Sequence, residues 1–266
     1  MGLTDIYRPI AGELGAVKEN LRGAARSENG FVRRLADDLL SSPGKLLRPA
    51  LVLFAARVGG KNKRSAVELA SAIELLHLAT LVQDDAIDKA ELRRGKRSIQ
   101  KRWGEAAAVL FGDYLFTRAF GILSLLNDHR VLRSLLSVSR VMAVGELEQI
   151  HRAGRKISTR KYFEIINKKT AALFEACCET GALVGKANAA QTAVLKNFGR
   201  NFGLGFQIVD DCLDAATEKE HLPATKKRAA EYMELGKIAL DGVLPAGASG
   251  PFIELCDHVL ARAPDA

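Results

Sequence analysis

Apolar positions recur along this chain at the three- and four-residue spacing of an α-helix, from one end to the other. No run alternates apolar and polar residues for long enough to predict a sheet. There is no internal repeat and no low-complexity segment. The sequence therefore predicts an all-α fold, a single-domain helical bundle over residues 1–266. We expect a basic loop at 89–104 and helices over 3–26, 31–40, 48–58, 65–88, 105–126, 131–151, 159–185, 190–214, 218–241 and 251–262.

One of these helices ends in a group of acids. Residues 69–94 begin as an apolar helix and run without a breaker into Asp84, Asp85 and Asp88. Aspartate is a mediocre helix former and is costly to bury unpaired. At about 100° per residue, His77, Asp84 and Asp88 lie within roughly 20° of one another, on one polar stripe of an apolar helix. This stripe is a candidate site.

A second acidic group with the same spacing lies at residues 203–214. Asp210, Asp211 and Asp214 again follow an apolar approach, and Gln207 lies near the stripe of Asp210. One isolated group is more typical of a helix end whose acids face solvent, but two matched groups are harder to explain in that way. Carboxylates gathered inside a bundle repel one another unless cations neutralise them. Oxygen ligands without a His or Cys cluster indicate a hard ion such as magnesium, which commonly bridges carboxylates to a phosphate.

Basic residues lie where they can complete a phosphate site. Arginine binds phosphate oxygens in a two-pronged manner, and lysine acts as a point charge. Any one of them alone is more typical of a solvated surface charge, just as His77 alone is more typical of a satisfied core histidine. Lys169 differs, because the stretch that follows it should be core. The candidates are Lys45, Arg48, Arg93, Arg94 and Lys169, with Thr170 beside the last.

The formal net charge is +8, from 39 basic and 31 acidic residues. That balance suits an anionic partner, but the basic residues are spread out except around 93–102, which disfavours a nucleic-acid surface. The four cysteines have neither metal-ligand spacing nor a disulfide framework, so we expect reduced thiols in a cytoplasmic protein. No signal peptide and no apolar run of transmembrane length stands out, so we expect no transmembrane segment.

Seven motifs together resemble the trans-isoprenyl diphosphate synthases, in particular the polyprenyl and geranylgeranyl synthases, from about residue 40 to about residue 215. The resemblance implies an α-helical bundle, usually a homodimer, around a deep central cavity. It also implies a magnesium-dependent transferase that condenses isopentenyl diphosphate head-to-tail with an allylic diphosphate. The motifs are GKLLRP (44–49), ELLHLATLVQDDAID (74–88), RRGKRS (93–98), GD (112–113), GELEQI (145–150), KTAALFEACCETGA (169–182) and FQIVDDCLD (206–214).

The same resemblance implies roles for individual residues. Its metal ligands would be Asp84, Asp88, Asp210 and Asp214, with Asp85 as a further catalytic acid and Lys169 as a catalytic cation. Its isopentenyl diphosphate pocket would be Lys45, Arg48, His77 and Arg94. Its contacts to the allylic diphosphate would be Arg93, Lys169, Thr170 and Gln207.

The residues before the first acidic group bear on product length. Thr80 lies one turn below Asp84, and Ala79 flanks it. In the resembled family, bulky aromatic residues at these two places form the floor of the cavity and give short products. The small residues here imply a product of geranylgeranyl length or longer, unless an aromatic side chain closes the cavity lower down. The candidates for that closure are Phe111, Phe116 and Phe120.

The chain departs from the family pattern after Asp214. Relatives continue with a lysine- and glycine-containing loop, a further aspartate and a GKxTLP segment, whereas residues 215–232 here lead almost directly to a later helix, so the domain looks shortened. Two other functions therefore stay open. A non-catalytic or regulatory subunit of a heteromeric synthase would not need both acidic groups. A terpene cyclase would have little use for the isopentenyl contacts Lys45, Arg48 and Arg94.

Overall fold

The computed structural model describes residues 2–42, 44–60, 63–152, 157–218 and 225–263, with the helical backbone alone for 214–218. Within these ranges the chain is a single helical domain, as expected, and its strands are confined to one short hairpin. The elements are α1 (Leu3–Tyr7), η1 (Arg8–Ile10), α2 (Ala11–Ala25), α3 (Gly30–Leu40), α4 (Leu47–Gly59), α5 (Lys63–Ile87), β1 (Leu92–Arg93), β2 (Lys96–Arg97), α6 (Ile99–Trp103), α7 (Glu105–Leu125), α8 (His129–His151), α9 (Thr159–Ile166), η2 (Asn167–Ala171), α10 (Ala172–Gly185), α11 (Ala189–Glu218), α12 (Lys226–Leu240) and α13 (Gly250–Leu260).

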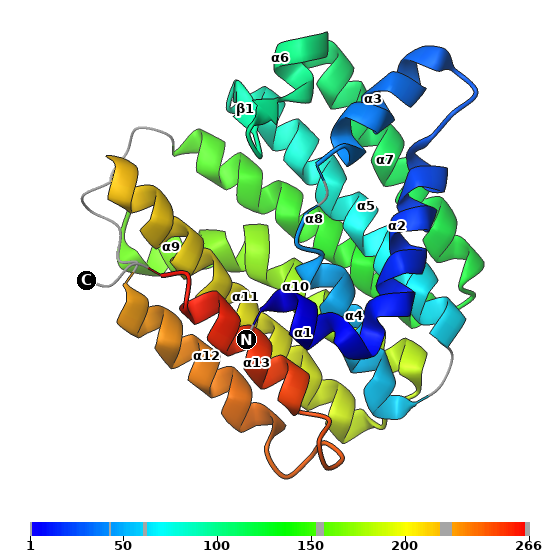
Figure 1. Cartoon of the computed structure of the whole chain (residues 1–266). Coiled ribbons are helices and arrows are strands. Elements are labelled where there is room, and N and C mark those ends of the chain that lie inside the picture. The colour runs from blue at the N-terminus through cyan, green and yellow to red at the C-terminus, as the bar shows by residue number, and fades with distance from the viewer. Residues whose placement is uncertain (1, 43, 61–62, 153–156, 219–224, 264–266) are drawn as a thin grey trace.

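Helices α5 and α10 occupy the middle of the bundle (Figure 1). The apolar residues of α5, such as Leu69, Ile73 and Leu76, are almost fully buried because α2, α4 and α7 pack around them. Helix α10 packs on α4, α8 and α11. Burial on several sides explains why the sequence of α5 is more apolar than that of a surface helix.

Glycines let the neighbours of α10 approach it backbone to backbone. A Cβ atom on Gly181 would lie 2.5 Å from the Val52 carbonyl oxygen of α4, and one on Gly185 would lie 2.1 Å from that of Ala56. A Cβ on Gly199 of α11 would lie 2.5 Å from the Phe174 carbonyl oxygen of α10. Any residue other than glycine at these positions would force the backbone to shift, because its Cβ atom would overlap a main-chain atom.

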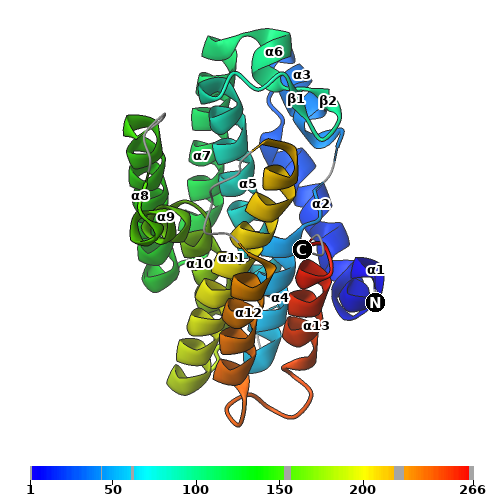
Figure 2. The same ribbon diagram turned by 90° about the vertical axis from the view of Figure 1, so that its left-hand side faces the viewer.

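Helices α7 and α8 form one flank of the bundle, with α8 at its outer edge (Figure 2). Both α5 and α7 are long and apolar enough, by length and composition alone, to cross a membrane. In the most apolar stretch of α5, 67% of the residues are buried, which is typical of a core helix. In that of α7, 33% are buried. Helix α7 therefore leaves apolar side chains such as Leu110 and Leu125 on its outer face.

The expected loop at 89–104 contains more structure than its sequence predicts. Strands β1 and β2 pair antiparallel around Arg94 and Gly95, which both have positive φ angles (52° and 76°). Two-residue hairpin turns of this kind require positive φ at both central residues. Helix α6 follows, and the Ser98 side chain caps it by accepting a hydrogen bond from the Lys101 N–H. Two-residue strands are too short to leave an alternating pattern, which is why the sequence predicts only a loop.

Two expected helices are interrupted. The helix expected over 3–26 changes to the 3₁₀ turn η1 at Pro9, whose ring lacks the N–H needed for an α-helical hydrogen bond. The helix expected over 159–185 contains the π-turn η2 between α9 and α10. The segment between α11 and α12, where the domain is expected to be shortened, lies outside the described residues.

Candidate active site

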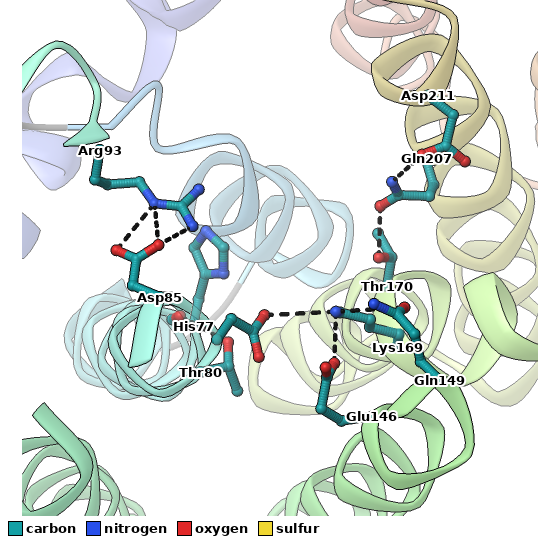
Figure 3. Close-up of polar contacts among 11 residues, drawn as sticks. His77, Thr80, Asp85, Arg93, Glu146, Gln149, Lys169, Thr170, Gln207 and Asp211 are labelled. Carbon is teal, nitrogen blue, oxygen red and sulfur yellow. Dashed lines mark hydrogen bonds and ion pairs between the residues drawn. The ribbon is translucent and has the colours of Figure 1, made fainter. Parts of the chain in front are cut away.

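A cavity of about 640 Å³ opens between α5, α8, η2 and α11. Figure 3 shows the polar contacts at and behind its wall, with Asp85 and Arg93 on one side, Thr170, Gln207 and Asp211 on the other, and Lys169 and Glu146 between them. The remaining wall is largely apolar and comes mainly from α5, α7 and α8. The apolar lining residues are Leu81, Ile87, Phe116, Met142, Ala143, Leu147, Ile150 and, from α11, Phe206.

The acids of the first group, Asp84, Asp85 and Asp88, face different surroundings. Asp84 lines the cavity from the last turn of α5. Asp85, one step further around the helix, is only 3% exposed and accepts hydrogen bonds from the Arg93 guanidinium, with Nε at 2.9 Å (Figure 3). Asp88 lies just beyond the end of α5 and is exposed. Of the three, Asp84 alone lines the cavity, and Asp85 holds Arg93, a residue predicted to bind phosphate.

Lys169 lies between two carboxylates from different helices. Its Nζ is 2.5 Å from Oε2 of Glu146 on α8 and 3.8 Å from Oδ2 of Asp84 on α5 (Figure 3). Burial raises the pKa of Asp84 to about 6, and the nearby Glu146 and Asp88 add to this effect while Lys169 opposes it. A cation held in this way neutralises acids across the cavity and is placed to contact an anion.

The π-turn η2 brings Lys169 and Thr170 to the cavity together. A π-turn inserts one extra residue into a helix and is frequent at functional sites. Two neighbouring helices pack closely against it at glycines. A Cβ on Gly145 of α8 would lie 3.1 Å from the Lys169 nitrogen, and one on Gly203 of α11 would lie 2.6 Å from the Ala171 Cα. The turn is therefore held between two helix backbones.

The second acidic group also divides between different neighbours. Gln207 and Asp210 line the cavity from α11. Asp210 forms an ion pair with Arg262, which follows α13, at 2.9 Å. Asp211 accepts a hydrogen bond from the Gln207 side-chain amide at 3.0 Å. The Asp214 side chain lies outside the described residues, so its role as a metal ligand stays a prediction.

Arg48 and His77 form the buried end of the predicted isopentenyl diphosphate pocket. Arg48 NH1 lies 3.1 Å from His77 Nε2, and the guanidinium lies over the Phe174 ring at 4.3 Å. Burial lowers the pKa of His77 well below its usual value, and the charge of Arg48 adds to this. The imidazole is therefore neutral and can accept the hydrogen bond. In the described part of the chain, no hydrogen-bond partner faces the buried Arg48 Nε, as expected of a donor that meets a ligand.

Arg94 and Lys45 lie nearer the surface. Arg94 lines the cavity, and its NH1 donates to the Ser42 carbonyl oxygen at 2.8 Å. Lys45 is exposed just before α4 and does not line the cavity. Its pKa is lowered by partial burial and by the charge of Arg262, while Asp210 opposes this change. Lys45 therefore lies within electrostatic range of the second acidic group.

The predicted product-length residues differ in exposure to the cavity. Thr80 lines it, with its hydroxyl donating to the His77 carbonyl oxygen at 2.8 Å, whereas Ala79 is fully buried in the bundle core. Of the three candidate closing residues, Phe116 lines the cavity, and Phe111 and Phe120 do not. The apolar end is therefore bounded by Thr80 and Phe116.

The oxygen donors at the cavity fit a hard divalent cation that is shared with a ligand. Among the described side chains, no group of three or more His, Cys, Asp or Glu lies close enough to hold a metal ion. The acids are spread instead, with Asp84 and Glu146 near Lys169 and Asp210 on α11. Mg²⁺ suits such a site because it keeps several waters and uses only one or two carboxylates together with substrate phosphates.

Two residues of the site, Glu146 and Arg262, are missing from the sequence-based prediction. Glu146 belongs to the GELEQI motif, so the resemblance to the synthases contains a signal for it. Arg262 lies near the end of the sequence, and no local pattern distinguishes it from other surface arginines. Its contact with Asp210 spans 52 residues of sequence and depends on the packing of α13 against α11.

Comparisons with known proteins place these features in one family. A family model described as polyprenyl synthetase matches residues 29–240. A geranylgeranyl diphosphate synthase of Methanosarcina mazei is 35% identical over 90% of this chain and 74% of its own length. Heptaprenyl diphosphate synthase component 2 of Geobacillus stearothermophilus is 39% identical over 84% of this chain and 70% of its own. A polyprenyl synthase structure from Caulobacter crescentus CB15, complexed with calcium and isoprenyl diphosphate, has a TM-score of 0.91 and 30% identity, covering 99% of this chain and 98% of that chain.

Asp84 should make the stability of the metal-free protein depend on pH. Its pKa is about 6 in the folded protein against 3.8 for an unperturbed aspartate, so the folded state binds this proton more tightly. The resulting stabilisation is fully present below the lower pKa and is lost as pH rises through the upper one. In urea denaturation with EDTA, we expect the unfolding free energy of the parent to fall between pH 4 and pH 7 by about 2 kcal/mol more than that of Asp84→Asn.

Asp241→Asn is the matched control, because Asp241 is exposed after α12 and does not contribute to the raised pKa of Asp84, so it should leave the pH dependence of the parent intact. Equal pH dependence in the parent and in Asp84→Asn would contradict the raised pKa of Asp84.

Proposed function

Since the chain belongs to the polyprenyl synthetase family, whose members here are transferases that elongate prenyl diphosphates, we propose that its cavity condenses isopentenyl diphosphate head-to-tail with an allylic prenyl diphosphate. One observation carries this proposal. Cationic and amide side chains from α4, β1, η2 and α11 meet at one part of a cavity whose remaining wall is apolar. Such a cavity matches a substrate with an anionic head and a long hydrocarbon tail.

The allylic diphosphate fits the side of the cavity formed by η2 and α11. Lys169, Thr170 and Gln207 all line it there, and Arg93 reaches it from β1. When the carbon–oxygen bond of this substrate ionises, negative charge develops on the departing diphosphate. Donors already in place stabilise that charge without having to reorganise. Lys169 can contribute by turning from Glu146 toward the diphosphate, since both partners lie within reach of one flexible side chain.

Magnesium is the metal that this donor set suits best. Asp84 and Asp88 would hold it on the α5 side, and Asp210 with Asp214 on the α11 side. When bound, Mg²⁺ acts as a Lewis acid on diphosphate oxygens and so makes the diphosphate a better leaving group. The complex of the Caulobacter crescentus polyprenyl synthase with calcium and isoprenyl diphosphate supports a divalent cation at this fold.

Isopentenyl diphosphate fits the side formed by Arg48, His77 and Arg94, with Lys45 at its outer edge. The unpaired Nε of Arg48 is a donor for its phosphate oxygens, and neutral His77 holds the guanidinium by accepting from it. The isopentenyl double bond attacks the allylic cation to form the new carbon–carbon bond, and a proton is then lost, with the departing diphosphate as its acceptor. No protein nucleophile is required, and apolar walls keep water away from the cation.

The reaction can be tested with isopentenyl diphosphate, Mg²⁺ and allylic starters of different lengths, followed by chromatography of the dephosphorylated products. We expect elongated prenols, and about a hundredfold loss of kcat/KM in Lys169→Met, the order observed when one preorganised donor to developing charge is removed. Lys168→Met is the matched control, because Lys168 pairs with Glu148 at 2.7 Å and does not line the cavity.

Absence of any elongated prenol from all starters would overturn the proposal. Product formed only after addition of a second synthase subunit would favour the regulatory-subunit alternative. A hydrocarbon or alcohol formed from the allylic substrate without isopentenyl diphosphate would favour the terpene cyclase.

Product length follows from the apolar end of the cavity. We expect Thr80→Phe to shorten the product and Phe116→Ala to lengthen it, because both side chains line the cavity and their volumes set the room for the growing chain. The measurement is the chain-length distribution of the dephosphorylated prenols. Phe120→Ala, on the same helix but away from the cavity, should leave the distribution unchanged. An unchanged distribution in both cavity variants would contradict this assignment of the product floor.

The outer face of α7 and α8 suits a second copy of this chain. Leu110 and Leu125 of α7 are 68% and 77% exposed, and Leu136 of α8 is 50% exposed. Exposed apolar side chains gathered on neighbouring helices mark an interaction surface. The resemblance to a family that is usually homodimeric supports the same arrangement.

Light scattering coupled to size-exclusion chromatography tests the homodimer. The parent should have twice the mass of one chain at micromolar concentration, and Leu110→Glu should weaken the dimer by placing a charge in an apolar contact. Leu92→Glu is the control, since Leu92 is 63% exposed on β1, away from α7 and α8. A monomeric parent would refute the dimer.

A further inference from the structure

A continuous row of hydrogen bonds runs behind the candidate allylic site, from the cavity wall to helix α9. The Thr170 hydroxyl donates to the Gln207 side-chain oxygen at 2.7 Å, and the Gln207 amide nitrogen donates to Asp211 at 3.0 Å (Figure 3). The Tyr162 hydroxyl donates to the second oxygen of Asp211 at 2.5 Å. Thr170 and Gln207 line the cavity, whereas Asp211 and Tyr162 do not.

Every hydrogen bond in this row points toward Asp211. An ionised carboxylate can only accept hydrogen bonds. The carboxylate of Asp211 must therefore face the NH₂ group of the Gln207 side chain and not its carbonyl oxygen. Burial raises the pKa of Tyr162, and the charge of Asp211 adds to this, so the phenol stays protonated and donates to the carboxylate. The Gln207 oxygen then faces Thr170, and the second amide hydrogen of Gln207 remains for an acceptor in the cavity. A reversed amide would place two oxygens 3.0 Å apart.

The row also ties helix α9 and the π-turn that follows it to one helix, α11. Tyr162 belongs to α9, before the turn, and Thr170 lies within it, yet both reach α11 through Asp211 and Gln207. Tyr162 is only 4% exposed, and its ring packs edge-on against Phe163 with centroids 5.1 Å apart, so its hydroxyl has little freedom to move. Loss of the hydroxyl therefore loosens the turn and the Gln207 amide together.

We propose that Tyr162 and Asp211 are positioning residues for the allylic diphosphate, which they serve by fixing the orientation of the Gln207 amide and the place of Thr170. This rests on the proposed function. It assigns Asp211 a role different from that of the neighbouring Asp210, since Asp211 acts through Gln207 and not as a metal ligand. The isopentenyl pocket around Arg48 and His77 shares no member with the row.

The test compares Tyr162→Phe and Asp211→Asn with the parent in steady-state kinetics with farnesyl diphosphate, isopentenyl diphosphate and Mg²⁺. Each variant should raise the KM for farnesyl diphosphate about fivefold, the order of one lost hydrogen bond. The KM for isopentenyl diphosphate and the Mg²⁺ concentration for half-maximal rate should stay at parental values. The double variant should resemble either single one, because both break the same row.

Tyr114→Phe is the matched control. Its hydroxyl donates to the Arg26 carbonyl oxygen at 2.9 Å, far from the row, so it loses an equivalent bond and should keep both KM values. A merely structural role of the row would lower the melting temperature and the active fraction while leaving both KM values unchanged. That result in Tyr162→Phe, or in Asp211→Asn if the first variant does not fold, overturns the inference. So does a changed Mg²⁺ requirement in Asp211→Asn. A parent that elongates no starter would refute the proposed function instead.

Discussion

Direct contact between helix backbones around α10 is the constraint on which the rest of the structure depends. Gly181 and Gly199 let α4 and α11 touch α10, and Gly145 and Gly203 extend the same contact to the π-turn η2. Side chains at such contacts have no room to adjust, so the path of the main chain determines where Lys169 lies. The cavity is therefore formed by closely packed helices, which place most of its polar residues, while Arg93 and Arg94 reach it from the hairpin.

The same rigidity explains how adjacent acids acquire different roles. On a helix, neighbouring residues point about 100° apart. Asp84 consequently lies at the cavity, while Asp85 lies in the packed region beneath the hairpin and holds Arg93. On α11, Asp210 and Asp211 are divided in the same way, between Arg262 on one side and Gln207 on the other. A repeated pair of aspartates thus supplies one residue to the cavity and one to its support.

Sequence periodicity predicts the fold well where elements are long. The limits of α5 and α7 agree with expectation to within two residues, and Asp84 of the acidic group at the end of α5 lines the cavity. The hairpin at 92–97 is too short to have a period. The π-turn at Lys169 leaves the apolar spacing almost unchanged, because it shifts the helix by a single residue. The contact of Lys169 with Glu146 joins residues on separate helices, and such long-range pairs are not visible in local patterns.

The ion pair between Lys169 and Glu146 has a consequence for which anions the site retains. Lys169 already has a carboxylate partner 2.5 Å away, so an incoming anion competes with Glu146 for this cation. A ligand with a single carboxylate would only take the place of the Glu146 carboxylate at Lys169, so it would gain little binding free energy from the exchange. A diphosphate carries several charges and many acceptor oxygens, so it profits from the exchange and from the neighbouring donors at once. We therefore expect this competition between Glu146 and an incoming anion to favour polyanions over simple carboxylates.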